Sequence, residues 1–186
     1  MDKNYFDGIV GASIRVCGVT LANLSVWHMA ILEAIESPFV SEGEAGLRDI
    51  IILAKVAQCS YPDEPNLKPL FRDGWWLYRM SRDSNLAAVQ MIKLRKWFDV
   101  QMSAPVLYKS IDENKKVKGT SSPTMLALVS ALVSRSNETF HTVWNMRMSE
   151  ARWYDVSLAE QDGVELTISY DNEEPAAETP DGAEAI

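Results

Sequence analysis

The sequence is poor in the side chains on which most enzyme sites depend. It contains only two histidines, His28 and His141, and two cysteines, Cys17 and Cys59, among 186 residues. No HExxH or CxxC spacing, G-x-S-x-G element, phosphate-binding loop or dinucleotide fingerprint occurs. We therefore predict no catalytic residues, no metal site and no cofactor, and a protein that is not an enzyme. A small enzyme with an unrecognised site is the rival hypothesis.

Long apolar runs are also lacking. A bilayer span needs roughly 18–20 apolar residues, and the best candidate, residues 21–35, is interrupted by Asn23, Ser25, His28 and Glu33. The N-terminus has no basic-then-apolar layout of a signal peptide. We therefore predict a cytosolic protein without a membrane segment. In that compartment two reduced, buried thiols are favoured over a disulfide.

Positive charge does not exceed negative charge in the body of the chain. Residues 164–186 carry seven acids and no Lys or Arg, which leaves 26 − 7 = 19 acids against 18 bases in residues 1–163. Nucleic acid, which requires a basic face, is therefore not an expected partner. An inhibitor that mimics nucleic acid would need acids spread over a folded face, whereas here they lie in the tail.

The acidic tail has two interpretations. Residues 171–186 are rich in Pro, Ala and acids, and we predict that they are disordered when free. Residues 164–170 alternate with period two, which is typical of a strand. The tail either serves solubility, or presents Leu166, Ile168 and Tyr170 to a partner's sheet edge or groove.

Helical periodicity dominates the rest of the sequence. It predicts a mainly α protein, with one helical domain of about six or seven helices over residues 1–163 and a short extended or β segment near each end. Glycines punctuate residues 1–20, which favours a small hairpin. Residues 109–121 are polar and predict a flexible loop. The expected helices cover residues 21–36, 47–59, 69–80, 83–103, a central apolar one from Pro123, a short one capped by Asn137, and 150–162.

Tryptophans are the most informative side chains present. Trp75 and Trp76 are adjacent, so on a helix they point about 100° apart and cannot both face one core. Either one is exposed at a partner surface, where Trp is enriched, or helices pack on both sides. Trp144, Trp153 and Tyr154 are further candidates. The eight methionines suit either an adaptable binding surface or gap filling in the core.

Short segments at both ends resemble a known family. Residues 24–28 (LSVWH) and 35–40 (IESPFV), with the YPDEP exit at 61–65, resemble the opening of small phage tail proteins. Residues 143–154 (VWNMRMSEARWY) and 158–163 (LAEQDG) resemble the W-x-M-P-…-A-x-W-Y-…-E-x-x-G close of phage tail assembly chaperones. Arg147 stands where that family commonly has proline. The resemblance covers about a third of the chain.

This resemblance implies a role without catalysis. Such chaperones are helical proteins of the host cell cytoplasm that coat the tape measure protein and help recruit tail tube subunits. The resemblance implies the tape measure protein and the tail tube protein as partners, and it leaves self-association open. The candidate interface residues are Trp75, Trp76, Trp144, Trp153, Tyr154, Leu166, Ile168 and Tyr170. The alternative is a structural virion subunit, such as a neck, connector or baseplate component, which would remain in purified particles.

Overall fold

Helices dominate the part of the chain that the structure describes, as the sequence predicts. The structure is a computed structural model that describes residues 13–21, 23–41, 43–103, 107–108, 123–163 and 167–168. The seven helices in these ranges are α2 (Val26–Ala34), α3 (Leu47–Val56), α4 (Phe71–Arg82), α5 (Ser84–Gln101), α6 (Thr124–Arg135), α7 (Phe140–Asn145) and α8 (Met148–Gln161). The predicted loop at 109–121 lies outside the described residues.

A small hairpin precedes the helices and confirms the prediction for this region. β1 (Ile14–Val16) pairs antiparallel with β2 (Val19–Leu21). The turn residues Cys17 and Gly18 both have positive φ, 48° and 74°. Two-residue hairpin turns favour such left-handed residues because their twist matches that of the strands.

The first helix begins later than the periodicity indicates. Residue 21 belongs to β2, and α2 starts at Val26 after the N-cap Ser25. The Ser25 side chain accepts the backbone N–H of His28 at 3.4 Å, and His28 Nδ1 accepts the N–H of Ser25 at 2.9 Å. This reciprocal capping box fixes the start of the helix, so the prediction of a helix from residue 21 was wrong.

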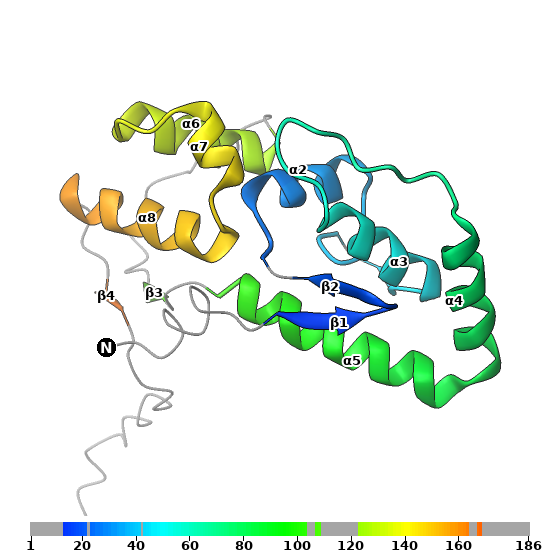
Figure 1. Cartoon of the computed structure of the whole chain (residues 1–186). Helices are drawn as coiled ribbons and strands as arrows, with labels where there is room; N and C mark the ends of the chain where they lie inside the picture. The colour runs from blue at the N-terminus through cyan, green and yellow to red at the C-terminus, as the bar shows by residue number, and fades with distance from the viewer. Residues whose placement is uncertain are drawn as a thin grey trace, which may run out of the picture.

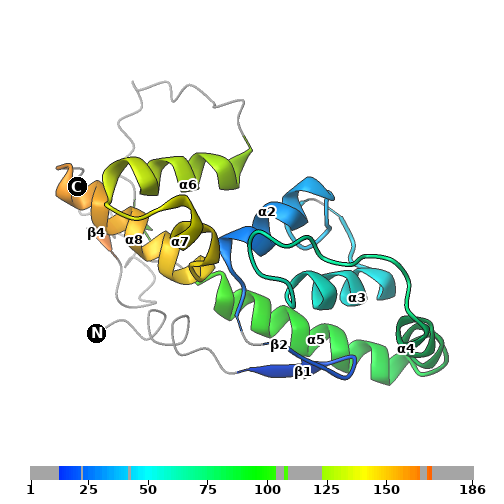
Figure 2. The same cartoon turned by 45° about the horizontal axis from the view of Figure 1, so that its top comes forward.

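Helix α2 occupies the middle of the fold. It contacts α3 on one side and α6, α7 and α8 on the other (Figures 1 and 2). Two backbone hydrogen bonds, Val26 N to Met146 O at 3.0 Å and Met148 N to Leu24 O at 2.8 Å, join its start to the α7–α8 junction. The prediction that the apolar helix after Pro123 is central was wrong, because α6 leaves Leu126 exposed at the surface.

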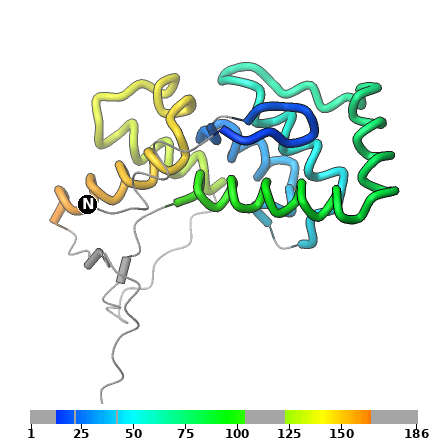
Figure 3. Tube along the Cα trace, turned by 60° about the horizontal axis from the view of Figure 1, so that its bottom comes forward, coloured from blue at the N-terminus to red at the C-terminus, as the bar shows by residue number. Residues whose placement is uncertain are grey.

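Helix α5 supports the hairpin. It lies beside β1 (Figures 1 and 2), and Figure 3 shows it running along one edge of the fold. It contributes Leu94, Trp97 and Phe98 to a hydrophobic core that extends from β1 to α8. Its buried Gln90 and Gln101 side chains each accept a backbone N–H at 3.0 Å, from Cys17 and Leu24 respectively. Side-chain amides therefore take the place of backbone partners for the N-terminal segment.

Helix ends near the C-terminus differ from the predicted caps by a few residues. Thr139, not Asn137, caps α7, and α8 begins at Met148, before Ser149. In the predicted tail strand, β4 (Thr167–Ile168) pairs antiparallel with β3 (Leu107–Tyr108). The remaining residues of the tail, including Leu166 and Tyr170, lie outside the described part.

Candidate protein-interaction surface

The N-terminus of α4 is anchored to α3 by a buried ion pair. Lys55 Nζ lies 2.5 Å from Asp73 Oδ2, and both side chains are 8 % exposed. Lys55 Nζ also donates to Lys68 O at 2.6 Å, and the Asp73 carboxylate accepts the N–H of Leu70 at 2.8 Å. The carboxylate is thus both ion-pair partner and helix cap, so it fixes where α4 starts and how the helix is oriented.

Helix α4 has an inner and an outer face, and both carry large apolar side chains. Asp73, Leu77 and Met80 follow helical spacing on the inner face, and Met80 is buried. Phe71, Trp75, Tyr78 and Arg82 follow it on the opposite side, as positions i, i+4, i+7 and i+11. The three aromatic side chains there are 94 %, 45 % and 57 % exposed, respectively. We call Phe71, Trp75 and Tyr78 the aromatic stripe.

Two arginines stack on aromatic rings of α4. The guanidinium carbon of Arg79 lies 4.9 Å from the centroid of the Trp75 ring and 5.7 Å from that of Trp76. The guanidinium of Arg82 lies 5.3 Å from the Tyr78 ring and donates to its hydroxyl at 2.8 Å. These contacts hold long side chains against the rings and so give the surface an ordered, cationic border.

The two adjacent tryptophans take different roles, as their 100° separation requires. Their rings meet edge to face with centroids 5.0 Å apart. Trp75 is on the exposed side, whereas Trp76 packs against the core and the hairpin turn. A Cβ at Gly18 would lie 3.3 Å from Trp76 Nε1, so glycine allows both the positive φ and the close approach.

Trp144 belongs to an aromatic cluster that joins three segments. Its ring lies 5.5 Å from Trp27 of α2 and 6.0 Å, stacked, from Tyr61 of the connector. Trp27 Nε1 also donates to Asp63 O at 3.0 Å. The structure therefore gives Trp144 a packing contact that links α7, α2 and the connector.

The other predicted interface residues are not brought together with Trp75. Trp153 and Tyr154 are half-buried on α8, which lies away from α4 in Figure 1. Ile168 is in β4, where only the backbone is described. Phe71 and Tyr78 were missed by sequence reasoning. Their spacing of four and three residues from Trp75 is the signal that could have found them.

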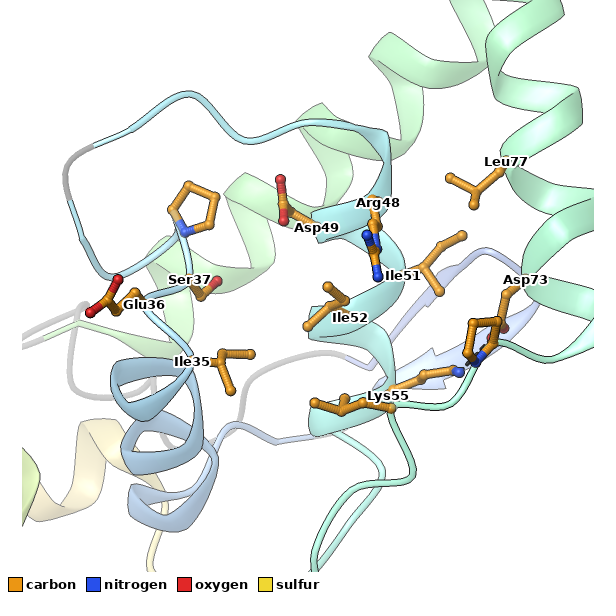
Figure 4. Close-up of a pocket in the computed structure, with 13 residues that line it drawn as sticks. Ile35, Glu36, Ser37, Arg48, Asp49, Ile51, Ile52, Lys55, Asp73 and Leu77 are labelled. Atoms are coloured by element: carbon orange, nitrogen blue, oxygen red, sulfur yellow. Dashed lines mark ion pairs between the residues drawn. The ribbon is translucent and has the colours of Figure 1, made fainter.

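An apolar groove of about 500 Å³ flanks the inner side of α4. Ile35 at the C-terminal cap of α2, Ile52 of α3 and Leu77 of α4 line it, and the Lys55–Asp73 pair lies at one end (Figure 4). The groove and the aromatic stripe therefore lie on opposite sides of α4.

The described residues contain no group of three or more His, Cys, Asp or Glu side chains placed to hold a metal ion. No helix in this part combines the length and apolar character required to span a bilayer.

Both cysteines are free thiols, as predicted, although Cys59 is only half-buried. Burial raises the pKa of the Cys17 thiol to about 11; the charge of Arg72 acts to lower this pKa and that of Asp73 to raise it. This thiol is therefore protonated at neutral pH and is a poor nucleophile.

Comparison with known proteins identifies no relative: no protein-family model, curated protein or solved structure matches the chain. The candidate surface is therefore interpreted from its own residues.

His28 has a structural role. Its Nδ1 accepts the N–H of Ser25, and its Nε2 lies 2.6 Å from Cys59 O. A carbonyl can only accept, so Nε2 carries the proton and the ring is neutral. Burial lowers the pKa of His28, and the bond to the Cys59 carbonyl acts in the opposite direction.

We expect His28 to make folding stability pH-dependent. Because its pKa is lower folded than unfolded, the unfolded chain binds more protons as the pH falls below about 6.5, and the free energy of unfolding decreases. Urea denaturation at pH 7 and pH 5 should show this decrease in the wild type and a smaller one in His28→Gln. His141→Gln, at an exposed position on α7, is the matched control and should retain the wild-type decrease. If the free energy of unfolding decreased equally between pH 7 and pH 5 in all three proteins, this role of His28 would be contradicted.

Proposed function

We propose that this protein is a non-enzymatic phage tail assembly chaperone that binds the tape measure protein and helps recruit tail tube subunits. The observation that supports binding is the aromatic stripe of Phe71, Trp75 and Tyr78, which points away from the core of its own chain. The resemblance at residues 24–40 and 143–163 supports the choice of partner.

The aromatic stripe has the chemistry of a binding surface. Tryptophan, tyrosine and arginine are the residues most enriched among those that dominate binding energy at interfaces. Here they occur together, with Arg79 and Arg82 stacked on the rings. A tape measure protein offers long helices with apolar stripes, and such a helix can lie along α4 with its apolar side on these rings.

The buried Lys55–Asp73 pair supports the same interpretation. It holds α4 to α3 through polar contacts on the inner face, so the outer face is not required for packing. A helix that carries large apolar residues on a face it does not use for its own fold buries them only when a partner binds.

The proposal is tested by co-expressing this protein with the tape measure protein of the same genome and isolating the complex. We expect the wild type to keep the tape measure protein soluble and to co-purify with it. The triple variant Phe71→Ser, Trp75→Ser, Tyr78→Ser should weaken binding by more than about 100-fold, because each aromatic anchor contributes about 2 kcal/mol or more. Phe140→Ser is the matched control, since Phe140 is a 51 % exposed aromatic residue on α7.

Unfolding curves for each variant establish that loss of binding is not loss of structure. A tape measure protein that stays insoluble beside the wild type would reject the chaperone role. Full binding by the triple variant would reject the aromatic stripe as the interface. Mass spectrometry of purified particles separates the chaperone, which is absent, from the alternative of a structural virion subunit.

A further inference from the structure

A second feature of α4 is a pocket on its hairpin side. It has a volume of about 300 Å³ and is lined by Arg15, Cys17, Gly18, Trp76, Gln90 and Lys93. The hairpin, α4 and α5 each contribute side chains, and Figure 1 shows the turn of the hairpin directed toward α4. We call it the basic pocket.

The basic pocket carries unbalanced positive charge. Arg15 and Lys93 line it, Arg79 stacks on the Trp76 ring, and no lining residue is acidic. The ion pairs in the described residues involve only Lys55 and Arg135 as bases. Two exposed cations beside an aromatic wall, with no acidic residue in the lining, favour an anionic occupant.

We propose that this pocket holds the acidic segment 171–186 of the same chain. That segment supplies the complementary charge: it contains Asp171, Glu173, Glu174, Glu178, Asp181 and Glu184 and no Lys or Arg. The body of the chain is near neutral, so this segment is the strongest source of negative charge available to the pocket at high local concentration.

The length of the segment permits this contact. Ile168 pairs with Leu107 in the β3–β4 ladder. From Leu107 back to Lys93 the chain spans at most about 35–40 Å, because the residues within α5 rise only about 1.5 Å each. Residues 169–186 can extend to about 60 Å. Asp181 and Glu184 therefore reach Arg15 and Lys93 without any change in the described fold.

This contact does not depend on the tape measure protein. The basic pocket adjoins Arg79, which also stacks on Trp75 of the aromatic stripe. The acidic segment therefore neutralises cations beside the stripe in the free protein, and an acidic partner would compete with it for the same cations.

Nuclear magnetic resonance of the full-length, ¹⁵N-labelled protein tests the inference. In low salt, the amide signals of residues 178–186 should differ from those of an isolated peptide of residues 169–186. The double variant Arg15→Glu, Lys93→Glu should move these signals to the peptide positions, as should about 0.5 M salt, which screens exposed charges beyond a few ångströms. The matched control is Arg95→Glu, Lys96→Glu, two exposed α5 positions outside the pocket, and should leave the signals unchanged.

Four outcomes would overturn the inference. Wild-type tail signals identical to those of the peptide would show that the segment does not dock. Equal displacement by both double variants would indicate general attraction to net charge and no specific pocket. Loss of the wild-type signal differences on dilution would show that the segment docks on a second copy of the chain. The Trp76 indole signal should move together with the tail signals. If it moves only when inorganic phosphate is added, the pocket binds free phosphate and not the acidic segment.

Discussion

Replacing Asp73 by alanine is expected to lower the free energy of unfolding by about 3–5 kcal/mol, because it leaves the buried Lys55 ammonium without a counter-charge. The substitution also removes the acceptor for the Leu70 N–H at the start of α4. Urea denaturation at neutral pH measures the loss. The surface pair of Arg135 with Asp155, 3.8 Å apart and about 40 % exposed, provides the comparison, since Asp155→Ala should cost less than about 1 kcal/mol.

The double variant Lys55→Met, Asp73→Leu separates charge from packing. It removes both ions together, and replacing a buried pair by apolar residues of similar volume is often nearly neutral. We expect it to recover most of the stability lost in Asp73→Ala. A double variant as unstable as the single one would show that the hydrogen bonds to Lys68 and Leu70, and not the unpaired charge, carry the effect.

The Asp73 carboxylate should also make the free energy of unfolding decrease in acid. Burial acts to raise the pKa of Asp73, but hydrogen bonds from Lys55 and Leu70 and the charges of Lys55 and Arg72 outweigh it and lower the pKa. A carboxylate with a lowered pKa contributes stability above its unfolded value of about 3.9, and this contribution is lost as the pH falls through the folded value. The wild type should therefore lose more stability in acid than Asp73→Ala.

Replacing Gln101 by alanine is expected to lower the free energy of unfolding by about 2–3 kcal/mol. Gln101 is fully buried, and its carbonyl oxygen accepts the N–H of Leu24 at 3.0 Å. The variant leaves both a cavity and a buried backbone donor without its acceptor. Urea denaturation measures the loss, and hydrogen exchange should show that the Leu24 amide loses protection.

Gln101→Met distinguishes the two contributions. Methionine fills the volume but accepts no comparable hydrogen bond, and it also removes the Gln101 Nε2 group, which has no hydrogen-bond partner in the described structure. We expect a loss of about 1 kcal/mol with the same loss of Leu24 protection. If Gln101→Met costs as much as Gln101→Ala, the cavity is not the main term.

Together these residues explain how a helix can be held firmly and yet present an apolar outer surface. Lys55, Asp73 and the two buried glutamines fix α4, α5 and the hairpin through polar contacts inside the core. The aromatic stripe takes no part in these contacts. The same division places the basic pocket between elements that are already fixed by these contacts.

The sequence by itself determined the class of the fold and most helix positions, because apolar periodicity and capping residues are local signals. It also favoured a small hairpin within residues 1–20, and it determined the separation of Trp75 from Trp76 and the acidity of residues 164–186. Periodicity could not distinguish α2 from α6 as the central helix, since both are apolar on most sides and only long-range contacts decide which is covered.

Only the tertiary structure decided which side chains meet across long separations. The pairing of Lys55 with Asp73, the bonds from Gln90 and Gln101 to the N-terminal segment, and the convergence of Arg15, Trp76 and Lys93 join residues from different elements. No local pattern marks them, because a lysine or glutamine with these neighbours looks in sequence like any exposed polar residue. The aromatic stripe lies between the two cases: its spacing is local, but only the packing of the opposite face on α3 shows that it points outward.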